Sequence, residues 1–343
     1  MTETPIEPYP PRRVLVTGGL GFIGSHLVDR LLGDGDEVTV LDNLLIGDIR
    51  NVAPHQSDPR LRVVVGDARD ADVLAPLVAG ADVVVHLAAA LGVELVVEHP
   101  LMCLETNLLA THAVLEAAAA HRVPTMVASS SEVYGKSTTL PFGEGDDLVL
   151  GPTTCNRWSY AAAKLVDELL ALAFSTERGL PVVVLRFFNT VGPRQTGRYG
   201  MVVPRFVEAA LRGQPLPVHG DGEQSRCFLH VRDAVDAVVR LSRTPDAYGA
   251  VFNIGSEESV TINELAERVL DRAERQELLP VAAGPRIHHV PYADVFGPRF
   301  EDVRARRPDT TKLRALTGWH RRRTLDDVID DVLAERAKRL ALR

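Results

Sequence analysis

The chain has 343 residues, 45% hydrophobic and 24% charged, proportions typical of a globular protein with a sizeable core. Its net charge of −8 argues against a general nucleic-acid surface, which is usually basic, but permits a small anionic substrate. No apolar run approaches the ~18 residues of a membrane span, and residues 1–11 read as a disordered tail rather than a signal. Because the three cysteines are widely spaced and match no zinc pattern, we expect reduced thiols and a cytoplasmic protein.

Short apolar runs alternate with longer helical patterns over residues 12–189. Continuous Val and Leu runs bounded by helices are typical of parallel strands covered on both faces. The pattern predicts an α/β fold, a doubly wound parallel-sheet Rossmann domain. The expected strands lie at residues 14–18, 38–42, 61–67, 82–89, 125–131 and 181–189, and the expected helices at 22–33, 101–121 and 157–178.

The rhythm changes after residue 189. Loops rich in Gly, Pro and Arg alternate with isolated helices expected near residues 202–212, 231–243, 261–277 and 323–340. Such long loops in a compact protein are more often ligand-binding than idle. We therefore expect residues 190–343 to form mainly a smaller mixed α/β substrate lobe, with some of the chain returning to the Rossmann domain.

The segment TGGLGFIGSHL follows the first expected strand and opens the first expected helix. Gly18, Gly21 and Gly24 form G-x-x-G-x-x-G, a variant of the dinucleotide-binding fingerprint. A side chain at these positions would keep the backbone away from a pyrophosphate at the helix N-terminus. The pattern predicts a dinucleotide site at this turn, and small residues such as Ala88 at the end of the fourth strand let a cofactor lie close.

Acidic residues end the next two expected strands. Asp42, 18 residues after Gly24, is placed for the ribose hydroxyls of the dinucleotide. A carboxylate there repels a 2′-phosphate, so the sequence favours NAD over NADP. Asp67 either meets the adenine or caps a turn, and both interpretations stay open.

The segment NRWSYAAAKLVDE places Tyr160 and Lys164 four residues apart, hence on one helix face. A phenol with a pKa of ~10 is a poor base at neutral pH, but a fixed ammonium and a cationic nicotinamide favour its phenolate. Ser130 and Glu132, two apart on an expected extended strand end, would point the same way. These four residues predict a catalytic face, whereas we assign Tyr134 to packing.

Together these segments resemble the extended, sugar-nucleotide branch of the short-chain dehydrogenase/reductase superfamily, from about Arg13 to Leu333. The resemblance implies that Tyr160 is the base for a sugar hydroxyl, that Lys164 lowers its pKa and holds the nicotinamide ribose, and that Ser130 completes the hydrogen-bond network. The cofactor residues that it implies are Gly18, Gly21, Phe22, Ile23, Gly24, Asp42, Asn43, Asp67, Ala88, Asn107, Tyr160 and Lys164.

The resemblance extends to a UDP-sugar site. Asn189, in FFNTVGPR, and Arg226, in GEQSRCFLHVRD, match positions that contact the nucleotide diphosphate, and an Arg fork suits phosphate oxygens. Val203 lies in MVVPRFV, which is similar to the stretch that cradles the nucleobase. Whether the nucleotide is uridine or thymidine stays open.

The Ser131-Glu132 pair and the segment around Arg157 are similar to those of UDP-glucuronate decarboxylases. So is FEDVRARRPDTTKLRALTGW, in which Arg306 matches an arginine proposed as a proton donor. This resemblance implies C4 oxidation of UDP-glucuronate, loss of carbon dioxide, and UDP-4-keto-xylose or UDP-xylose as product. We expect Glu132 and Ser131 to position the carboxyl group, and Arg157 and Arg306 to bind substrate.

Three other interpretations remain. A UDP-sugar 4-epimerase commonly carries a non-acid at position 132, and a 4,6-dehydratase carries Asp rather than Ser131 before the Glu. A non-catalytic NAD-binding sensor on the same fold usually loses the Tyr or the Lys. The family resemblance also implies a homodimer through a four-helix bundle built from residues 101–121 and 157–178. We expect no metal, because His86, His112 and His121 have no partner at ligand spacing.

Overall fold

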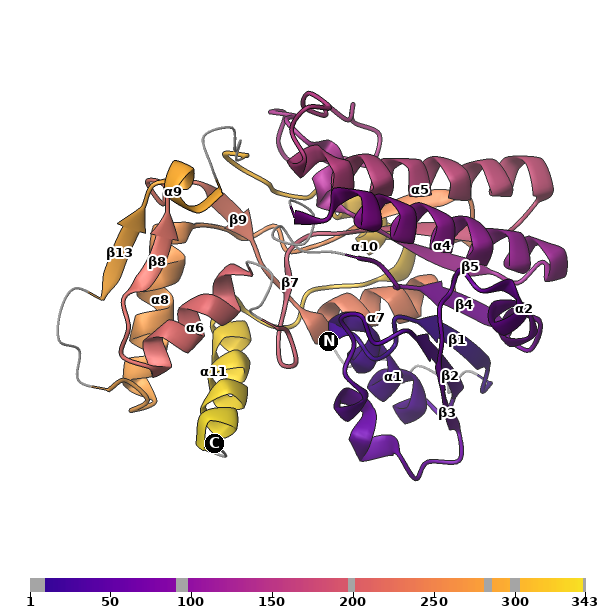
Figure 1. Cartoon of the computed structure of the whole chain (residues 1–343), viewed down its shortest axis with the longest axis horizontal. Helices are drawn as coiled ribbons and strands as arrows, with labels where there is room; N and C mark the ends of the chain where they lie inside the picture. Colours follow the sequence, from indigo (N-terminus) through magenta and orange to yellow (C-terminus); the bar gives the residue numbers. More distant parts are fainter. Residues whose placement is uncertain (1–9, 91–97, 197–200, 281–285, 297–302, 342–343) are drawn as a thin grey trace.

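The structure, a computed structural model, describes residues 10–90, 98–196, 201–280, 286–296 and 303–341. Most of the expected tail over residues 1–11 therefore lies outside the described residues. A seven-stranded sheet occupies the centre of the N-terminal half, in the order β3-β2-β1-β4-β5-β6-β11, and every neighbouring pair is parallel (Figure 1). The strands are β1 (Arg13–Thr17), β2 (Glu37–Asp42), β3 (Leu61–Val65), β4 (Val83–His86), β5 (Thr125–Ser130), β6 (Val182–Phe187) and β11 (Ala250–Ile254).

Helices cover both faces of this sheet, which confirms the doubly wound prediction (Figure 1). One face carries α1 and α7, and their apolar side chains share a core with the sheet. The other face carries α2, α4 and α5 over a second core. The helices are α1 (Phe22–Gly33), α2 (Ala71–Ala79), α4 (Pro100–His121), α5 (Arg157–Arg178) and α7 (Val231–Leu241), and the 3-10 turns are η1 (Ile49–His55), η2 (Ser131–Tyr134) and η3 (Pro245–Ala247).

All six expected strands and the three expected helices of this half are confirmed, although β3, β4 and β6 are shorter than expected. Buried valines and leucines explain the strands, since β-branched side chains pack well on a sheet covered on both faces. In the central sheet and the helices that cover it, the sequence analysis overlooked two elements. Helix α2 begins at an Asp70 cap, and β11 pairs with β6 from Ala250 opposite Val183 to Ile254 opposite Phe187.

The C-terminal lobe combines helices with three two-stranded sheets that pair β7 with β10, β9 with β12 and β8 with β13. A capping box of Thr261 and Glu264 begins α8, and its apolar face packs with α6 and α11. No helix within the described residues is long and apolar enough to cross a membrane. The elements are β7 (Thr190–Val191), α6 (Val202–Leu211), β8 (Leu216–His219), β9 (Ser225–Cys227), β10 (Leu229–His230), β12 (Ser259–Thr261), α8 (Ile262–Arg275), β13 (Ile287–Val290), α9 (Tyr292–Phe296), α10 (Thr311–Thr317) and α11 (Leu325–Ala341).

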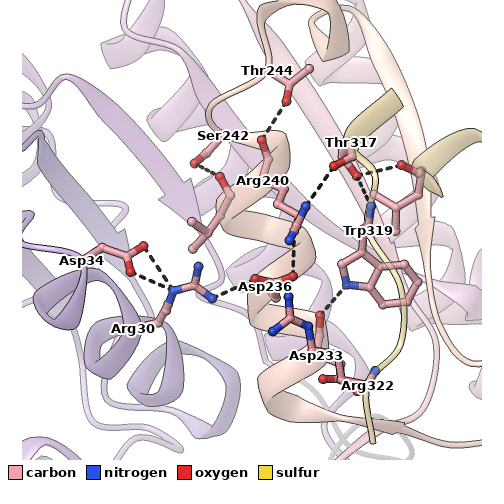
Figure 2. Close-up of polar contacts among 12 residues, drawn as sticks. Arg30, Asp34, Asp233, Asp236, Arg240, Ser242, Thr244, Thr317, Trp319 and Arg322 are labelled. Carbon is pink, nitrogen blue, oxygen red and sulfur yellow. Dashed lines mark hydrogen bonds and ion pairs between the residues drawn. The ribbon is translucent and has the colours of Figure 1, made fainter. Parts of the chain in front are cut away.

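Helix α7 ties the later part of the chain to the first helix of the sheet domain (Figure 2). Arg30 on α1 donates a hydrogen bond of 2.8 Å to Asp236, which also accepts one of 2.8 Å from Arg240. The indole of Trp319, which is 2% exposed, donates to the backbone carbonyl of Asp233 at 2.9 Å. Segments distant in the sequence therefore brace one face of the sheet, opposite the face covered by α4 and α5.

Candidate active site

The glycine turn between β1 and α1 forms one end of the site. Gly18 has a φ of +71°, and a Cβ placed on it would lie 2.7 Å from the backbone nitrogen of Ala88. A Cβ on Gly24 would lie 2.8 Å from the Cα of Gly19. Only glycine fits these positions, so the backbone amides at the start of α1 stay accessible to a pyrophosphate. The turn therefore fits a dinucleotide.

Asp42, at the carboxyl end of β2, is a fixed and buried acceptor. Its Oδ2 accepts a hydrogen bond of 3.0 Å from the backbone of Leu20, and its Oδ1 accepts one of 2.8 Å from that of Leu44. Burial raises the pKa of this carboxyl group above its ordinary value, and the two backbone hydrogen bonds oppose that shift. Each oxygen keeps a lone pair for a ribose hydroxyl.

Asp67 follows β3 and makes a local turn. It accepts hydrogen bonds from the backbone of Arg69 at 2.9 Å and from its guanidinium at 2.7 Å, and the amide of Asn43 donates to it at 3.3 Å. These contacts, with the Arg69 side chain first, lower the pKa of Asp67 to about 2. Asp67 thus caps a turn and also faces the cavity, so both interpretations of this residue have a structural basis.

One cavity of about 520 Å³, within the usual size of ligand sites, contains nearly all of the predicted site residues. The N-terminal half contributes Gly18, Gly21, Phe22, Ile23, Gly24, Asp42, Asn43, Asp67, Ala88, Ser130, Ser131, Glu132, Arg157, Tyr160 and Lys164. Asn189, Val203, Arg226 and Arg306 line its remaining walls. The sequence reading overlooked further lining residues in the C-terminal lobe, among them His219, Gln224 and Tyr292.

Asn107 is the one predicted site residue that does not line this cavity. Its side chain is fully buried, accepts a hydrogen bond of 2.7 Å from the backbone nitrogen of Ala90 and donates one of 3.1 Å to the Ala90 carbonyl. Both polar ends of the amide are therefore committed to the segment that follows β4. In this structure the Asn107 side chain holds the backbone at Ala90 and does not line the cavity.

Tyr160 and Lys164 lie one turn apart near the start of α5, and Ser130 ends the neighbouring strand β5. Burial raises the pKa of the Tyr160 phenol, while the Lys164 ammonium and the nearby Ser130 hydroxyl act in the opposite direction. The geometry thus supplies the hydroxyl, the phenol and the ammonium at one place.

The lysine is almost completely enclosed, with 2% of its side chain exposed. Its Nζ donates hydrogen bonds to the carbonyl of Ala128 at 2.9 Å and to Oδ2 of Asp167 at 3.0 Å. Burial disfavours the ammonium, yet Asp167 and other anionic neighbours raise the pKa of Lys164 above its ordinary value. The sequence reading did not single out Asp167, although a carboxylate one turn after a catalytic-type lysine is a visible signal in KLVDE.

The backbone at Glu132 differs from the extended strand end expected from the sequence. Strand β5 ends at Ser130, and residues Ser131–Tyr134 form a 3-10 turn. The hydroxyl of Ser130 caps this turn by accepting a hydrogen bond of 3.2 Å from the backbone nitrogen of Glu132. The alternation argument for Glu132 was therefore wrong, and the turn is what brings its carboxylate to the cavity beside Ser130.

Glu132 is held by an arginine from the far end of the chain. Both of its oxygens accept hydrogen bonds from the guanidinium of Arg306, one of them at 2.9 Å, and Arg157 lies 3.7 Å away. Burial works against the charge of Glu132, but Arg306, with Arg157 and Arg226, lowers the pKa of its carboxyl group to about 2. The side chains of Glu132 and Arg306 are 28% and 4% exposed. In this part of the cavity the carboxylate of Glu132 is therefore surrounded by three guanidinium groups.

A second buried network stands behind this site. The guanidinium of Arg186 on β6 binds both oxygens of Glu168, at 2.9 and 2.7 Å, and Ser129 donates to Glu168 at 2.5 Å. Arg186 also donates to the hydroxyl of Tyr134 at 2.9 Å. Tyr134 is fully buried and stacks on Phe142, which agrees with its assignment to packing, but its hydroxyl also links η2 to β6. The network fixes the end of β5, which carries Ser130, and the turn η2, which carries Glu132.

The buried His86 links two threonines. One ring nitrogen lies 2.7 Å from the Thr17 hydroxyl and the other 3.2 Å from that of Thr111. Within the residues that the structure describes, no group of three or more His, Cys, Asp or Glu side chains is arranged to hold a metal. In this structure His86 is a packed, hydrogen-bonded residue between β1, β4 and α4.

The chain is similar to proteins of one family. A UDP-N-acetyl-alpha-D-glucosaminuronate decarboxylase from Bacillus cytotoxicus is 39% identical over 90% of this chain and 92% of its own length. UDP-glucuronic acid decarboxylase 1 of Danio rerio is 34% identical over 91% of this chain and 72% of its own. A solved UDP-N-acetylglucosamine 4-epimerase from Methanobrevibacter ruminantium, in complex with UDP-N-acetylmuramic acid, superposes with a TM-score of 0.85 at 30% identity, over 96% of this chain and 100% of its own. Residues 14–255 match the sequence model of the NAD dependent epimerase/dehydratase family, and the chain belongs to that family.

Proposed function

We propose that this chain is an NAD-dependent decarboxylase that acts on UDP-glucuronate through C4 oxidation. The observation that carries the proposal is the Glu132–Arg306 pair beside Tyr160 and Lys164 in one cavity. A 4-epimerase needs only a base and a cofactor. The guanidinium groups around Glu132 suit a substrate that bears a carboxylate, and the charge of Glu132 suits a reaction that removes this carboxylate. The similarity to decarboxylases over nine-tenths of the chain supports the same function.

In the first step Tyr160 removes the proton of the C4 hydroxyl. The nearby Ser130 hydroxyl and the Lys164 ammonium both favour the phenolate that the reaction requires. Bound NAD+ supplies the hydride acceptor, and the product is UDP-xylose if the hydride returns to the sugar or UDP-4-keto-xylose if it does not. We assign the glycine turn and Asp42 to this cofactor, because both fit it in size and charge.

Oxidation at C4 prepares the loss of carbon dioxide. The new 4-ketone lies β to the C6 carboxylate, so the C5–C6 bond breaks with its electrons entering an enolate over C4 and C5. Arg157 and Arg306 bind the carboxylate and hold the C5–C6 bond in place. Ser131 and Glu132 lie beside it, and the negative charge of Glu132 favours conversion of the substrate carboxylate into neutral carbon dioxide.

A proton must then reach C5. The guanidinium of Arg306 does not give up its proton near neutral pH, and Glu132, with a pKa of about 2, is deprotonated there. We therefore assign proton delivery to a water molecule oriented by Arg306 and Glu132. The protons balance because the water that protonates C5 is itself reprotonated from bulk solvent. The phenol of Tyr160 returns the C4 hydroxyl proton when C4 is reduced, and releases it to solvent when the 4-ketone is the product.

The UDP moiety occupies the C-terminal side of the cavity in this proposal. Arg226 lies near Glu132 and supplies a cation for the diphosphate, and Asn189, whose amide donates to the Cys227 carbonyl at 3.1 Å, lies beside it. Val203 on α6 forms the apolar wall for the base. This placement supports the division of the chain near residue 189, with residues 12–189 binding NAD and residues 190–343 mainly binding substrate.

We also propose that two copies of the chain associate through α4 and α5, which lie side by side (Figure 1). Four large apolar side chains on these helices are exposed by 40% to 67%, namely Leu101, Leu109, Val166 and Leu169. Two helices from each copy would bury this stripe in a four-helix bundle. A cytoplasmic location stays a prediction from the spacing of the cysteines, and cell fractionation checks it.

Incubation of the purified protein with NAD+ and UDP-glucuronate tests the proposed reaction. We expect a sugar nucleotide lighter by one carbon dioxide, and its hydrogen count in the mass spectrum distinguishes xylose from the 4-ketone. The 2-acetamido uronate is the second candidate, favoured by the 39% identical relative, and the ratio of kcat/KM values decides between the two. If both uronates stay intact while UDP-glucose and its C4 epimer interconvert, the chain is an epimerase.

Replacing Gly18 with Ala is expected to weaken NAD binding at least about tenfold, because the Cβ meets Ala88 and the φ of +71° strains an L residue. Gly33→Ala is the matched control, since a Cβ at the end of α1 meets nothing within 4 Å. Fluorescence titration with NADH gives both affinities, and thermal unfolding confirms that each variant folds. Equal affinities in the two variants would show that the cofactor does not approach this turn.

For Glu132→Gln we expect decarboxylation to fall about 100-fold while C4 oxidation of a neutral UDP-sugar falls far less. The physical reason is that Gln keeps the size of the side chain but removes the charge placed beside the substrate carboxylate. Glu258→Gln is the control, because Glu258 also pairs with an arginine, Arg321 at 2.6 Å, yet does not line the cavity. Equal losses in both reactions would remove Glu132 from its special role.

Leu169→Glu should convert a dimer into a monomer, because a charge would replace an apolar side chain that is 59% exposed on α5. Ile49→Glu is the comparison, since Ile49 is 52% exposed on η1, which packs against α1. Light scattering after size exclusion measures the mass of each variant. A wild-type protein that is already monomeric at micromolar concentration contradicts the proposed interface.

A further inference from the structure

Lys164, the lysine one turn after Tyr160, has a buried counter-ion, Asp167. Nζ of Lys164 lies 3.0 Å from Oδ2 of Asp167, and the two side chains are 2% and 0% exposed. Both residues belong to α5, one turn apart, so the helix itself sets their separation. None of the proposed reaction steps uses Asp167, although its carboxylate contacts the Lys164 ammonium directly.

The other charged groups around this pair are already balanced. Glu132 on η2 is paired with Arg306, and Glu168 on α5 is paired with Arg186 on β6. These contacts leave Lys164 as the cation that neutralises Asp167. The buried carboxylate and the buried ammonium therefore depend on each other.

The uncharged titratable neighbours do not alter this balance. Burial, followed by the charge of Lys164, lowers the pKa of His86 on β4 to about 3, so its imidazole is neutral near pH 7. Cys103 on α4 packs beside Tyr160, and burial raises the pKa of its thiol, which keeps it protonated. Burial raises the pKa of Asp167, whereas the Lys164 ammonium and the hydroxyl of Thr111 on α4 favour its charged form.

The pair also limits where the ammonium can point. An ammonium has three N–H donors, and Lys164 directs two of them at Ala128 and Asp167. A single N–H remains for the cavity, which Lys164 and Tyr160 both line. A lysine without Asp167 would lose this orientation and, in a site with almost no access to water, would shed its proton more readily.

We propose that Asp167 is a positioning residue that keeps Lys164 charged and aimed at the cavity, and so sets the upper pH limit at which Tyr160 works as a base. The inference rests on the proposed roles of Tyr160 and Lys164, but not on the identity of the sugar. It predicts that a neutral residue at position 167 lets Lys164 lose its proton within the range where the wild-type lysine stays charged.

Nuclear magnetic resonance can follow the lysine directly, because the chain has four lysines, Lys136, Lys164, Lys312 and Lys338. Lysine labelled with 13C at Cε gives one signal per residue, and Lys164→Arg identifies the signal of interest. With NAD+ bound, we expect the Lys164 signal of Asp167→Asn to titrate at least about one pH unit below that of the wild type. Glu177→Gln, an exposed change on the same helix, is the control and should leave it in place.

Asp167→Glu keeps the charge and should restore most of the wild-type titration, which a purely structural role would not explain. If Asp167→Asn does not fold, Asp167→Glu still tests the proposal. It moves the carboxylate by one methylene, so the Lys164 signal should titrate at a slightly lower pH than in the wild type. An unchanged Lys164 titration in the folded variants overturns the proposal. A shift in a protein that turns over no UDP-sugar would uphold it while refuting the proposed function.

The rate profile supplies an independent readout. For Asp167→Asn, we expect the alkaline fall in kcat to begin at least about one pH unit below the pH at which it begins in the wild type. The KM for NAD+ should change less than threefold at pH 7, since the lysine is still charged there. A uniform loss of kcat at all pH values would contradict the proposal.

Discussion

The site depends on one constraint, the parallel direction of all seven strands in the central sheet. Because the strands run the same way, their carboxyl ends meet at one edge. The glycine turn after β1, Asp42 at the end of β2, Ser130 at the end of β5 and Asn189 after β6 are all brought to that edge. The topology of the sheet is therefore enough to place these residues around one cavity, whatever contacts their side chains make. The C-terminal lobe then closes it with Arg226 and Arg306.

The sheet could be predicted from the sequence because its information is local. Runs such as VLVT and VVVLRF are buried on both faces, and their composition alone distinguishes them from helices. Strand β11 was overlooked because AVFNI lies among loops and isolated helices, and its place in the sheet is set only by pairing with β6. Helix α2 was overlooked although Asp70 gives it a cap, since Pro76 inside it weakens the helical pattern. The resemblance to the extended reductases, drawn from these local segments, is confirmed.

The residues of the candidate site also fall into those that the local sequence predicts and those that it does not. Spacing in the sequence predicts the three glycines and the pair of Tyr160 and Lys164. A tight turn and a helix face are both formed by residues that are close together in the chain. The partner of Glu132 is 174 residues away, and spacing cannot reveal it; only the family resemblance pointed to Arg306. The extended geometry assumed at Glu132 failed because the Ser130 hydroxyl captures the next turn, a competition between side chain and backbone that composition does not show. Asn107, by contrast, was assigned to the cofactor by resemblance, and its amide turns to Ala90 instead.

A shared principle explains the charges of the cavity. In the free protein Glu132 pairs with Arg306, Glu168 with Arg186 and Asp167 with Lys164, so each of these three carboxylates has a cationic partner. A substrate carboxylate that binds Arg306 must therefore share a guanidinium that Glu132 already holds with both oxygens. Two carboxylates on one cation repel each other, and the repulsion ends when one of them leaves as neutral carbon dioxide. In the proposed reaction the ion pair that stabilises the empty site thus becomes, once substrate is bound, a source of strain directed at the bond that breaks.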